Sequence, residues 1–318
     1  MRFVDFLKIL LATFLWGSSF SFVKLGLVNA DPLGFAGIRF TIAGFMLLAA
    51  AVAWQQIAGR GESRLTPASG SRGNVRWGYV ALIGVFTTFV AYAFFFMGMV
   101  RTSATSAALI DGAGPIISSV MAHFVLHNDR LDRRKAAAIL LAFAGIAFIA
   151  LARPQGDNTR AISMSGCLLI LVGIAGGSIG TMLVINYRGA LGLVKLVGYQ
   201  HLFGGVMLLA AAAAVGEERH WAALANPRFL AIVTWLALVS AVAFRLWYGI
   251  VRRYKVTSVS VYAFITTIWG TAMSVVLVGE SPTPAHAAGG VLVVVALLLM
   301  RGRNDDPLRS SPTPPSVA

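Results

Sequence analysis

The sequence carries little charge, and little of that charge is negative. Only 12% of its 318 residues are Asp, Glu, Lys or Arg, whereas 58% are hydrophobic. A soluble protein usually has about a quarter charged residues, so this composition excludes an ordinary soluble domain and favours a membrane protein. Acidic residues number 12 against 26 basic ones. An acidic residue inside an apolar segment is therefore a feature that requires an explanation.

Cysteine is nearly absent, since Cys167 is the only one. A single cysteine inside an apolar segment excludes a disulfide framework and a cysteine-based metal site. The sequence also lacks a Walker-type phosphate loop, a dinucleotide-binding glycine motif and a zinc motif. We therefore expect no metal, no cofactor and no direct ATP-driven pumping.

Long apolar segments are what the sequence does contain, and most of the connections between them are only a few residues long. Hydropathy and length indicate that these segments are helices that cross a bilayer. The sequence thus predicts an all-α membrane protein with ten transmembrane helices. The predicted spans are roughly residues 5–28, 33–57, 77–100, 104–126, 134–152, 164–187, 194–215, 229–251, 257–278 and 285–300.

Basic residues are distributed unevenly between the two sides of the predicted membrane protein. Ten spans place both termini on one side, and most Lys and Arg residues fall in the loops of that side. The positive-inside rule then predicts a multi-pass protein of the cytoplasmic (inner) membrane with both termini in the cytoplasm. This asymmetry also explains the net charge of +14 without a nucleic-acid partner. The opposite side holds Arg101, Arg153, Arg160, Arg219 and Arg228.

The two halves of the sequence resemble each other. The stretch GFMLLAAA that begins at Gly44 returns as GVMLLAAA at Gly205, in the second and seventh predicted spans. Two halves of five spans must run in opposite directions because five is odd. We therefore expect two inverted-topology five-helix repeats, a layout that suits alternating access to a site at the membrane midplane. The predicted units are residues 1–152 and 153–300, followed by a disordered cytoplasmic tail at 301–318.

Several longer stretches resemble the EamA-type half of the drug/metabolite transporter superfamily. The first half contains FLWGSSFSFVKLGL, DPLGFAGIRFTIAGFMLLAA and TSATSAALIDGAGPIISSVMAHFVL, and the second contains TSVSVYAFITTIWGTAMSVVLVGESPTPAHAAGGVLVVVALLL. The resemblance covers roughly residues 8–300. It implies ten helices in two inverted bundles and a central cavity lined mainly by helices one, three, four, six, eight and nine. It also implies secondary transport, often export of amino acids or other metabolites.

The sequence departs from this family pattern in two places. The Gly-Glu pair expected after the fourth span is replaced by His127-Asn128, whereas Gly279-Glu280 keeps it after the ninth span. The proline of the fourth span, Pro115, has no counterpart in the ninth span. The two halves are therefore not equivalent.

The fourth predicted span contains a carboxylate, Asp111, about a third of the way along its length. Burying an unpaired polar group in lipid is costly, so such a group faces other helices or a wet cavity. Pro115 has no N–H to bond the carbonyl of Asp111, and Gly112 and Gly114 leave the backbone pliable. We therefore expect Asp111 to lie in a site and the span to bend at Gly112, Gly114 and Pro115.

Two basic residues, Arg39 and Lys24, lie at nearly the same depth as Asp111 when residues are counted from the outer ends of the spans. We expect Asp111 to bind a cationic group or a proton, and Arg39 or Lys24 to bind a carboxylate or a phosphate. The alternative is a structural ion pair between helices, with the Lys24 side chain reaching to the membrane interface.

Aromatic residues are expected to form the walls of the same substrate site, in particular Trp16, Tyr92 and Trp269. Aromatic walls suit an apolar or aromatic substrate, and they also bind a cation by cation–π contact. The alternative is that these rings face lipid or anchor the protein at the membrane interface.

The stretch GGSIG at residues 176–180 allows two interpretations. It fits the G-x-S-x-G pattern of a nucleophilic serine, Ser178, for which His201 or His286 could serve as the base. It also has the GxxxG spacing of closely packed membrane helices. We favour packing, because the same Gly-Ser pair occurs at Gly17 in the first span. A packing feature is expected to recur in both halves, whereas a nucleophile is expected only once.

The sequence as a whole predicts a secondary membrane transporter without enzymatic activity. The expected function is export of a small polar or amphipathic metabolite, such as an amino acid, by alternating access. The alternatives are a broad-specificity drug exporter and an intramembrane serine hydrolase. The expected partners are the small-molecule substrate and the lipid bilayer, with no nucleic acid, and the expected assembly is a monomer or a weak homodimer.

Overall fold

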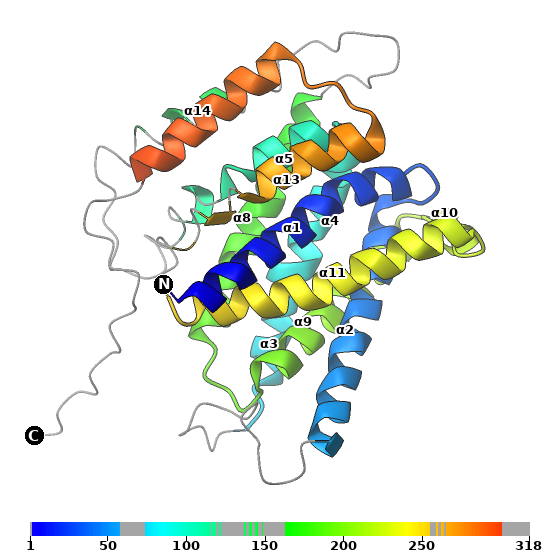
Figure 1. Cartoon of the computed structure of the whole chain (residues 1–318). Coiled ribbons are helices and arrows are strands. Elements are labelled where there is room, and N and C mark those ends of the chain that lie inside the picture. The colour runs from blue at the N-terminus through cyan, green and yellow to red at the C-terminus, as the bar shows by residue number, and fades with distance from the viewer. Residues whose placement is uncertain are drawn as a thin grey trace, which may run out of the picture.

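All regular structure in the described part of the chain is helical (Figure 1). The computed structural model describes residues 2–57, 74–114, 116–118, 121, 137, 140–141, 144–145, 148, 163–254, 259, 262–263 and 265–300. Several predictions lie outside these residues, and they concern Pro115, His127, Asn128, most of the fifth span and the tail at 301–318.

Within the described residues, six helices are long and apolar enough to cross a membrane. α1 has 24 residues, and a helix of that length is about 36 Å long, which exceeds the ~30 Å hydrocarbon core of a bilayer. Their boundaries agree with the predicted spans to within a few residues. They are α1 (Phe3–Gly26), α2 (Pro32–Ile57), the continuous α3 (Trp77–Gly84), η1 (Val85–Val90) and α4 (Ala91–Val100), α8 (Met164–Asn186), α9 (Leu193–Ala214) and α11 (Pro227–Val251).

Shorter helices complete the described part of the chain. α5 and α13 lie within the predicted fourth and ninth spans, and α14 corresponds to the predicted tenth. α10 lies in the connection between the predicted seventh and eighth spans. The shorter helices are α5 (Ala104–Asp111), α10 (Arg219–Ala223), α13 (Ile265–Met273), η2 (Ser274–Val278) and α14 (Pro284–Met300).

The helix of the fourth span tightens directly after Asp111. The N–H of Gly112 is shared between the carbonyls of Leu109 at 3.2 Å and Ala108 at 3.3 Å, and the N–H of Ala113 bonds the carbonyl of Ile110 at 3.0 Å. Bonds of this i→i−3 kind belong to a 3₁₀ turn rather than an α-helix. The predicted hinge thus coincides with a local change of helix geometry, and bending at this point stays a prediction.

α2 and α9 pack against each other through glycines. A Cβ atom added to Gly44 would lie 2.8 Å from the nitrogen of Leu202, and one added to Gly205 would lie 2.6 Å from the nitrogen of Thr41. Residue 205 follows residue 44 at the same spacing as residue 202 follows residue 41. The contact of Gly44 with Leu202 and that of Gly205 with Thr41 are therefore equivalent, with the glycine on α2 in the first and on α9 in the second.

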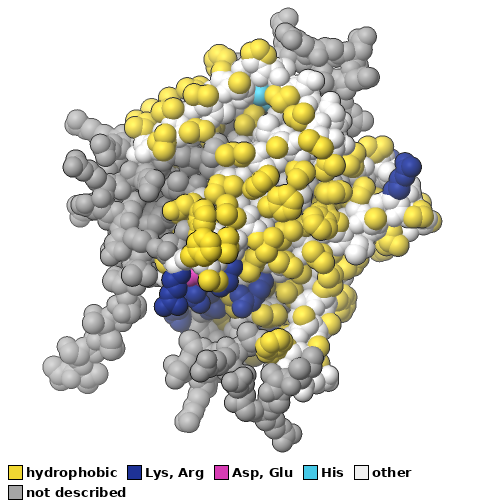
Figure 2. Space-filling model, in the orientation of Figure 1, with side chains coloured by type: hydrophobic (Ala, Val, Ile, Leu, Met, Phe, Trp, Pro, Cys, Tyr) yellow, Lys and Arg dark blue, Asp and Glu magenta, His cyan; other side chains and the backbone are white. Residues whose placement is uncertain are grey.

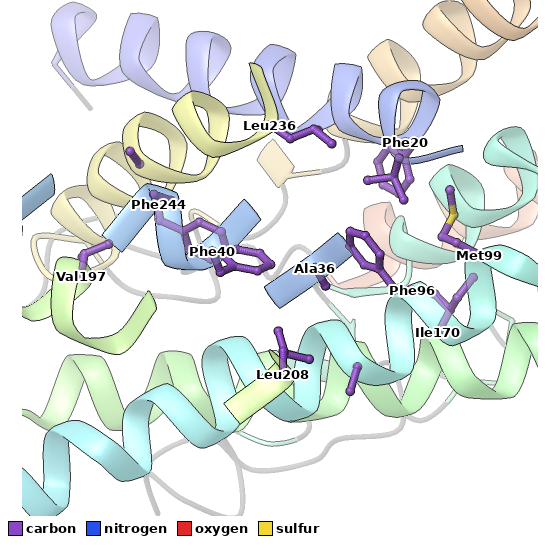
Figure 3. Packing of buried hydrophobic residues seen from close by; sticks show 14 of the residues in the cluster. Phe20, Ala36, Phe40, Phe96, Met99, Ile170, Val197, Leu208, Leu236 and Phe244 are labelled. Carbon is purple, nitrogen blue, oxygen red and sulfur yellow. The ribbon is translucent and has the colours of Figure 1, made fainter. Parts of the chain in front are cut away.

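The surface is strongly apolar across the middle of the molecule (Figure 2). Exposed apolar side chains include Leu7 and Leu11 of α1, Leu230 of α11 and Leu298 of α14. Basic side chains gather near the N-terminal end of α1 in the same view. Figure 3 shows that the interior is apolar too, with Phe40 of α2, Leu208 of α9 and Phe244 of α11 among the buried side chains. An apolar belt outside a packed apolar core is typical of a membrane protein.

Candidate functional site

A cavity of about 210 Å³ lies between the long helices, and we call it the central cavity. Its lining comes from α1, α2, η1, α4, α5, α8, α11 and α13. These helices belong to the first, second, third, fourth, sixth, eighth and ninth predicted spans. The resemblance implied all of these except the second span, which contributes Arg39.

The Asp111 side chain lines the central cavity from the end of α5. The residue is partly exposed. Ion pairs among the described residues join Asp5 to Lys8 and Arg253, and Asp31 to Arg219, and none of them involves Asp111. An ionisable group without a partner is costly inside a membrane protein. The carboxylate of Asp111 is therefore suited to bind a cationic group or a proton that enters the cavity.

Arg39 lines the same cavity and is 1% exposed. Its Nε donates a hydrogen bond to the Ser240 Oγ at 2.9 Å. Its guanidinium carbon lies 4.9 Å from the ring centre of Phe40 and 5.6 Å from that of Tyr92. Cation–π contacts stabilise a cation but leave its charge in place, and no described carboxylate forms an ion pair with Arg39. The central cavity thus contains an acidic and a basic side chain that form no ion pair with each other in the described structure.

Trp16 and Tyr92 also line the central cavity, and their role in substrate binding stays a prediction. The Trp16 ring packs edge-on against Trp247 with centres 5.4 Å apart, and Tyr92 packs on Phe40 with centres 4.2 Å apart. The indole N–H of Trp16 and the hydroxyl of Thr266 are buried without a partner in the described structure. Because buried polar groups are usually hydrogen-bonded, these two groups are available to a polar ligand.

Lys24 and Trp269 do not line the central cavity. The Lys24 Nζ donates to the backbone carbonyls of Met99, at 2.9 Å, and of Thr102. Lys24 lines a second cavity of about 700 Å³. We call it the outer cavity because the sequence predicts that these helix ends lie on the outer side of the membrane. Trp269 is 37% exposed and packs edge-on against Phe14, with ring centres 5.2 Å apart.

The structure adds small hydroxyl residues to the lining of the central cavity, which the sequence interpretation did not single out. They are Ser19, Thr87, Ser118, Thr181 and Thr266. Serine and threonine are common wherever membrane helices pack closely. Their presence in the sequence therefore gave no signal of a binding site.

Ser178 lines the central cavity but lacks the arrangement of a nucleophile. Its Oγ donates to a carbonyl of its own helix at 2.8 Å. Of the two histidines considered as its base, His201 hydrogen-bonds Thr88 at 3.2 Å and His286 hydrogen-bonds Ser106 at 2.9 Å. The neighbouring glycines pack closely against η1 and α4, which agrees with the packing interpretation.

The family model of the EamA-like transporter family matches residues 6–151 and 164–302. An Archaeoglobus fulgidus protein named "Uncharacterized transporter" is 25% identical over 297 residues, which cover 92% of this chain and 96% of that protein. A Salmonella typhimurium protein named "Probable amino-acid metabolite efflux pump" is 26% identical over 298 residues, with 91% and 92% coverage. The Escherichia coli "Uncharacterized inner membrane transporter YedA" is 26% identical over 315 residues, with 95% and 94% coverage.

The fold is also shared with a solved crystal structure. That structure superposes with a TM-score of 0.64 over 94% of this chain and 96% of its own chain, at 21% identity. The family matches extend over both halves of the sequence, and relatives of similar length are named transporters. This chain therefore belongs to the EamA-like transporter family and is a multi-pass membrane transporter.

Proposed function

We propose that this transporter exports a small polar or amphipathic metabolite, such as an amino acid, by alternating access. The observation that carries the proposal is that Asp111 and Arg39 line one cavity and form no ion pair among the described residues. A zwitterion offers an ammonium group to the first and a carboxylate to the second. The aromatic walls formed by Trp16 and Tyr92 suit an apolar substituent between the two charged groups.

Two further observations support this proposal. The Salmonella relative is named a probable amino-acid metabolite efflux pump, which supports both the substrate class and the direction. The unpartnered indole N–H of Trp16 and hydroxyl of Thr266 provide polar contacts for such a substrate within the cavity.

Two inverted five-helix repeats, at 1–152 and 153–300, are part of the proposal, because alternating access requires two parts that move against each other. The two separate family matches support them. The reciprocal contacts of Gly44 and Gly205 support them as well, since equivalent residues make equivalent contacts. The basic side chains near the N-terminus support placing both termini in the cytoplasm.

A broad-specificity drug exporter is the second candidate, because the aromatic walls alone would bind many apolar molecules. The two candidates differ in their dependence on charge. An exporter of zwitterions requires both charged groups of its substrate, whereas a drug exporter gains little from either.

Thermal-shift measurements on the purified full-length protein separate the candidates, with L-phenylalanine, L-phenylalaninamide and 3-phenyllactate as probes. The amide lacks the carboxylate, and phenyllactate lacks the ammonium group. We expect L-phenylalanine to raise the melting temperature most, because a ligand that binds the native state stabilises it and each missing charge leaves a buried group unpaired. Equal shifts from all three probes would favour the drug exporter.

Asp111→Asn tests the role of the carboxylate, with Glu218→Gln as a control because Glu218 is exposed and lines neither cavity. We expect Asp111→Asn to remove the preference for L-phenylalanine over phenyllactate. A hydrogen bond to a charged group contributes roughly 1.5–3 kcal/mol, so uptake of labelled phenylalanine into proteoliposomes should fall about tenfold to a hundredfold. Unchanged binding and uptake would leave Asp111 with a structural role only.

A further inference from the structure

The turn between α4 and α5 is held at both sides by charged side chains from other parts of the chain. α4 ends at Val100 and α5 begins at Ala104, so the turn is only Arg101–Ser103. The last carbonyls of a helix and the first N–H groups of the next have no partners within their helices. At this turn one lysine and one glutamate supply those partners.

Lys24 supplies the partner at the end of α4. Its Nζ reaches from α1 and donates to the carbonyls of Met99 and Thr102. The C-terminus of a helix carries partial negative charge, so an ammonium group is favourable there. Lys24 thus ties the first transmembrane helix to the end of the third.

Glu280 supplies the partner at the start of α5. One carboxylate oxygen accepts the N–H of Ala104 at 2.8 Å, and the other accepts that of Thr105 at 2.7 Å. Gly279 precedes it with φ 74°, a left-handed conformation that favours glycine. The N-terminus of a helix carries partial positive charge, which favours a carboxylate. Glu280 thus ties the segment after the ninth span to the start of the fourth.

Hydroxyl contacts strengthen the attachment made by Glu280. The Oγ1 of Thr105 hydrogen-bonds the Oγ of Ser274 in η2. The Oγ of Ser106 hydrogen-bonds the Nε2 of His286 in α14 at 2.9 Å. The first turn of α5 is therefore joined to both neighbouring elements of the second half.

α1 and α4 each contribute side chains to both cavities. The rings of Phe20 and Phe95 lie 5.8 Å apart, and both line the central cavity. Lys24 follows Phe20 by one helical turn and lines the outer cavity together with Thr102. The bonds made by Lys24 therefore join α1 to the end of α4 where both helices line the outer cavity.

We propose that Lys24 and Glu280 are a pair of latches that hold the hairpin of residues 77–111 in a form closed toward the outer cavity. Both latches release when the central cavity opens into the outer cavity. They are positioning residues, because they act through the hairpin that carries Tyr92 and Asp111. This inference rests on the proposed alternating access, and it assigns Lys24 a role other than substrate binding.

Accessibility of a cysteine in the central cavity tests the latches. In a Cys167→Ala background, Ser19→Cys places one thiol on the cavity wall, and a membrane-impermeant maleimide reports access from each face of oriented vesicles. Lys24→Met and Glu280→Gln each remove one latch. Lys195→Met and Glu218→Gln are matched controls, because these residues line neither cavity.

We expect each latch variant to label about tenfold faster than the parent from the outer face and more slowly from the cytoplasmic face, because the population shifts between two states. The controls should label as the parent does. Lys24→Arg keeps the cation, so its ratio of outer-face to cytoplasmic-face labelling rates should be close to that of the parent. Unchanged labelling from the outer face in both latch variants overturns the proposal. Faster labelling from both faces overturns it as well, because that result indicates general loosening.

This experiment requires no substrate, so its outcome is independent of the thermal-shift panel. A protein that binds none of the three probes but shows opposite labelling changes at the two faces would refute the proposed substrate and retain the latches.

Discussion

A buried guanidinium such as that of Arg39 is unfavourable unless a ligand or a neighbouring group offsets its charge. Arginine has five N–H donors, and in the described structure the Nε of Arg39 bonds Ser240. The rings of Phe40 and Tyr92 shield the charge. This arrangement differs from a structural ion pair, in which a carboxylate would lie against the guanidinium.

Arg39→Met distinguishes a ligand-binding arginine from a structural one. Methionine has a similar length and no charge, so we expect the free energy of unfolding to stay within ~1 kcal/mol of the parent value or to rise. Binding should lose its preference for L-phenylalanine over phenylalaninamide, measured by thermal shift. A loss of roughly 3–5 kcal/mol with retained preference is the result expected from a broken buried ion pair, and it would contradict the assignment.

The sequence predicted one depth for three charged residues, but it did not predict the direction in which each side chain points. Counting residues placed Asp111 and Arg39 at one level, and the structure brings both to the central cavity. Lys24 has a similar depth, yet its side chain reaches the carbonyls at the end of α4. Trp269 lies on a predicted cavity helix and is exposed. These spans are apolar on all sides, so periodicity does not mark their inward face.

At the scale of single elements, the connection between α9 and α11 covers the start of α2. The carboxylate of Glu217 accepts the N–H of Gly34 at 2.8 Å. The buried ring of His220 lies so close to Gly34 that an added Cβ would be 2.0 Å from its Nδ1, so only glycine fits. Burial raises the pKa of Glu217 above its ordinary value and lowers the pKa of His220 below its ordinary value.

The lowered pKa of His220 predicts a pH dependence of stability. The unfolded chain takes up a proton near pH ~6.5 that the folded protein resists. The contribution of neutral His220 is therefore complete above about pH 6.5 and is lost as the pH falls below that value. Melting temperatures at neutral and mildly acidic pH should show a smaller acid-induced decrease for His220→Phe than for the parent. An equal decrease in both proteins would contradict the prediction.

Hydropathy was sufficient to predict the six long helices but not the irregular segments within and between them. It averages over many residues, so it is insensitive to a local change of hydrogen bonding. Nothing in the sequence therefore predicted the π-helical segment at 85–90. The tight turns after Asp111 were indicated only by the nearby glycines and proline. The helix α10 was missed because it has only five residues.

At the scale of the whole molecule, the contact between α2 and α9 joins the two segments that match the family. Gly205→Ala adds a Cβ 2.6 Å from the nitrogen of Thr41, and relief requires movement of the backbone. We expect the free energy of unfolding to fall by ~1–3 kcal/mol, because an extra methyl group in a tightly packed contact destabilises a protein by about this amount. Gly78→Ala is the matched control, because nothing lies within 4 Å of its added Cβ.

Thermal melting of both alanine variants in the same detergent measures this difference. Gly78→Ala should be neutral or slightly stabilising, since alanine is the better helix former by about 1 kcal/mol. Similar melting temperatures for the two variants would show that the contact between Gly205 and Thr41 can relax.

The family was predictable from the whole sequence because patterns of small and apolar residues recur along its full length. The substrate was not, because it depends on which side chains meet inside one cavity. Arg39 and Asp111 lie far apart in the sequence, and only packing brings them to the same cavity. A resemblance in small and apolar residues identifies the fold but leaves the cavity chemistry open.

The π-helical segment has a consequence for the tolerance of the third span to deletions. Bonds of the i→i+5 kind place residues five apart over one another, and Thr87 and Tyr92, which line one cavity, are five apart. Deleting one residue from Val85–Val90 would let the segment become an ordinary α-helix, so the helix itself would remain intact. A deletion between Thr87 and Tyr92 would leave these residues four apart, and residues four apart lie on the same face of an α-helix. The third span should therefore tolerate this one-residue deletion and keep Tyr92 on the cavity wall, whereas a deletion from a regular α-helix turns everything beyond it by about 100°.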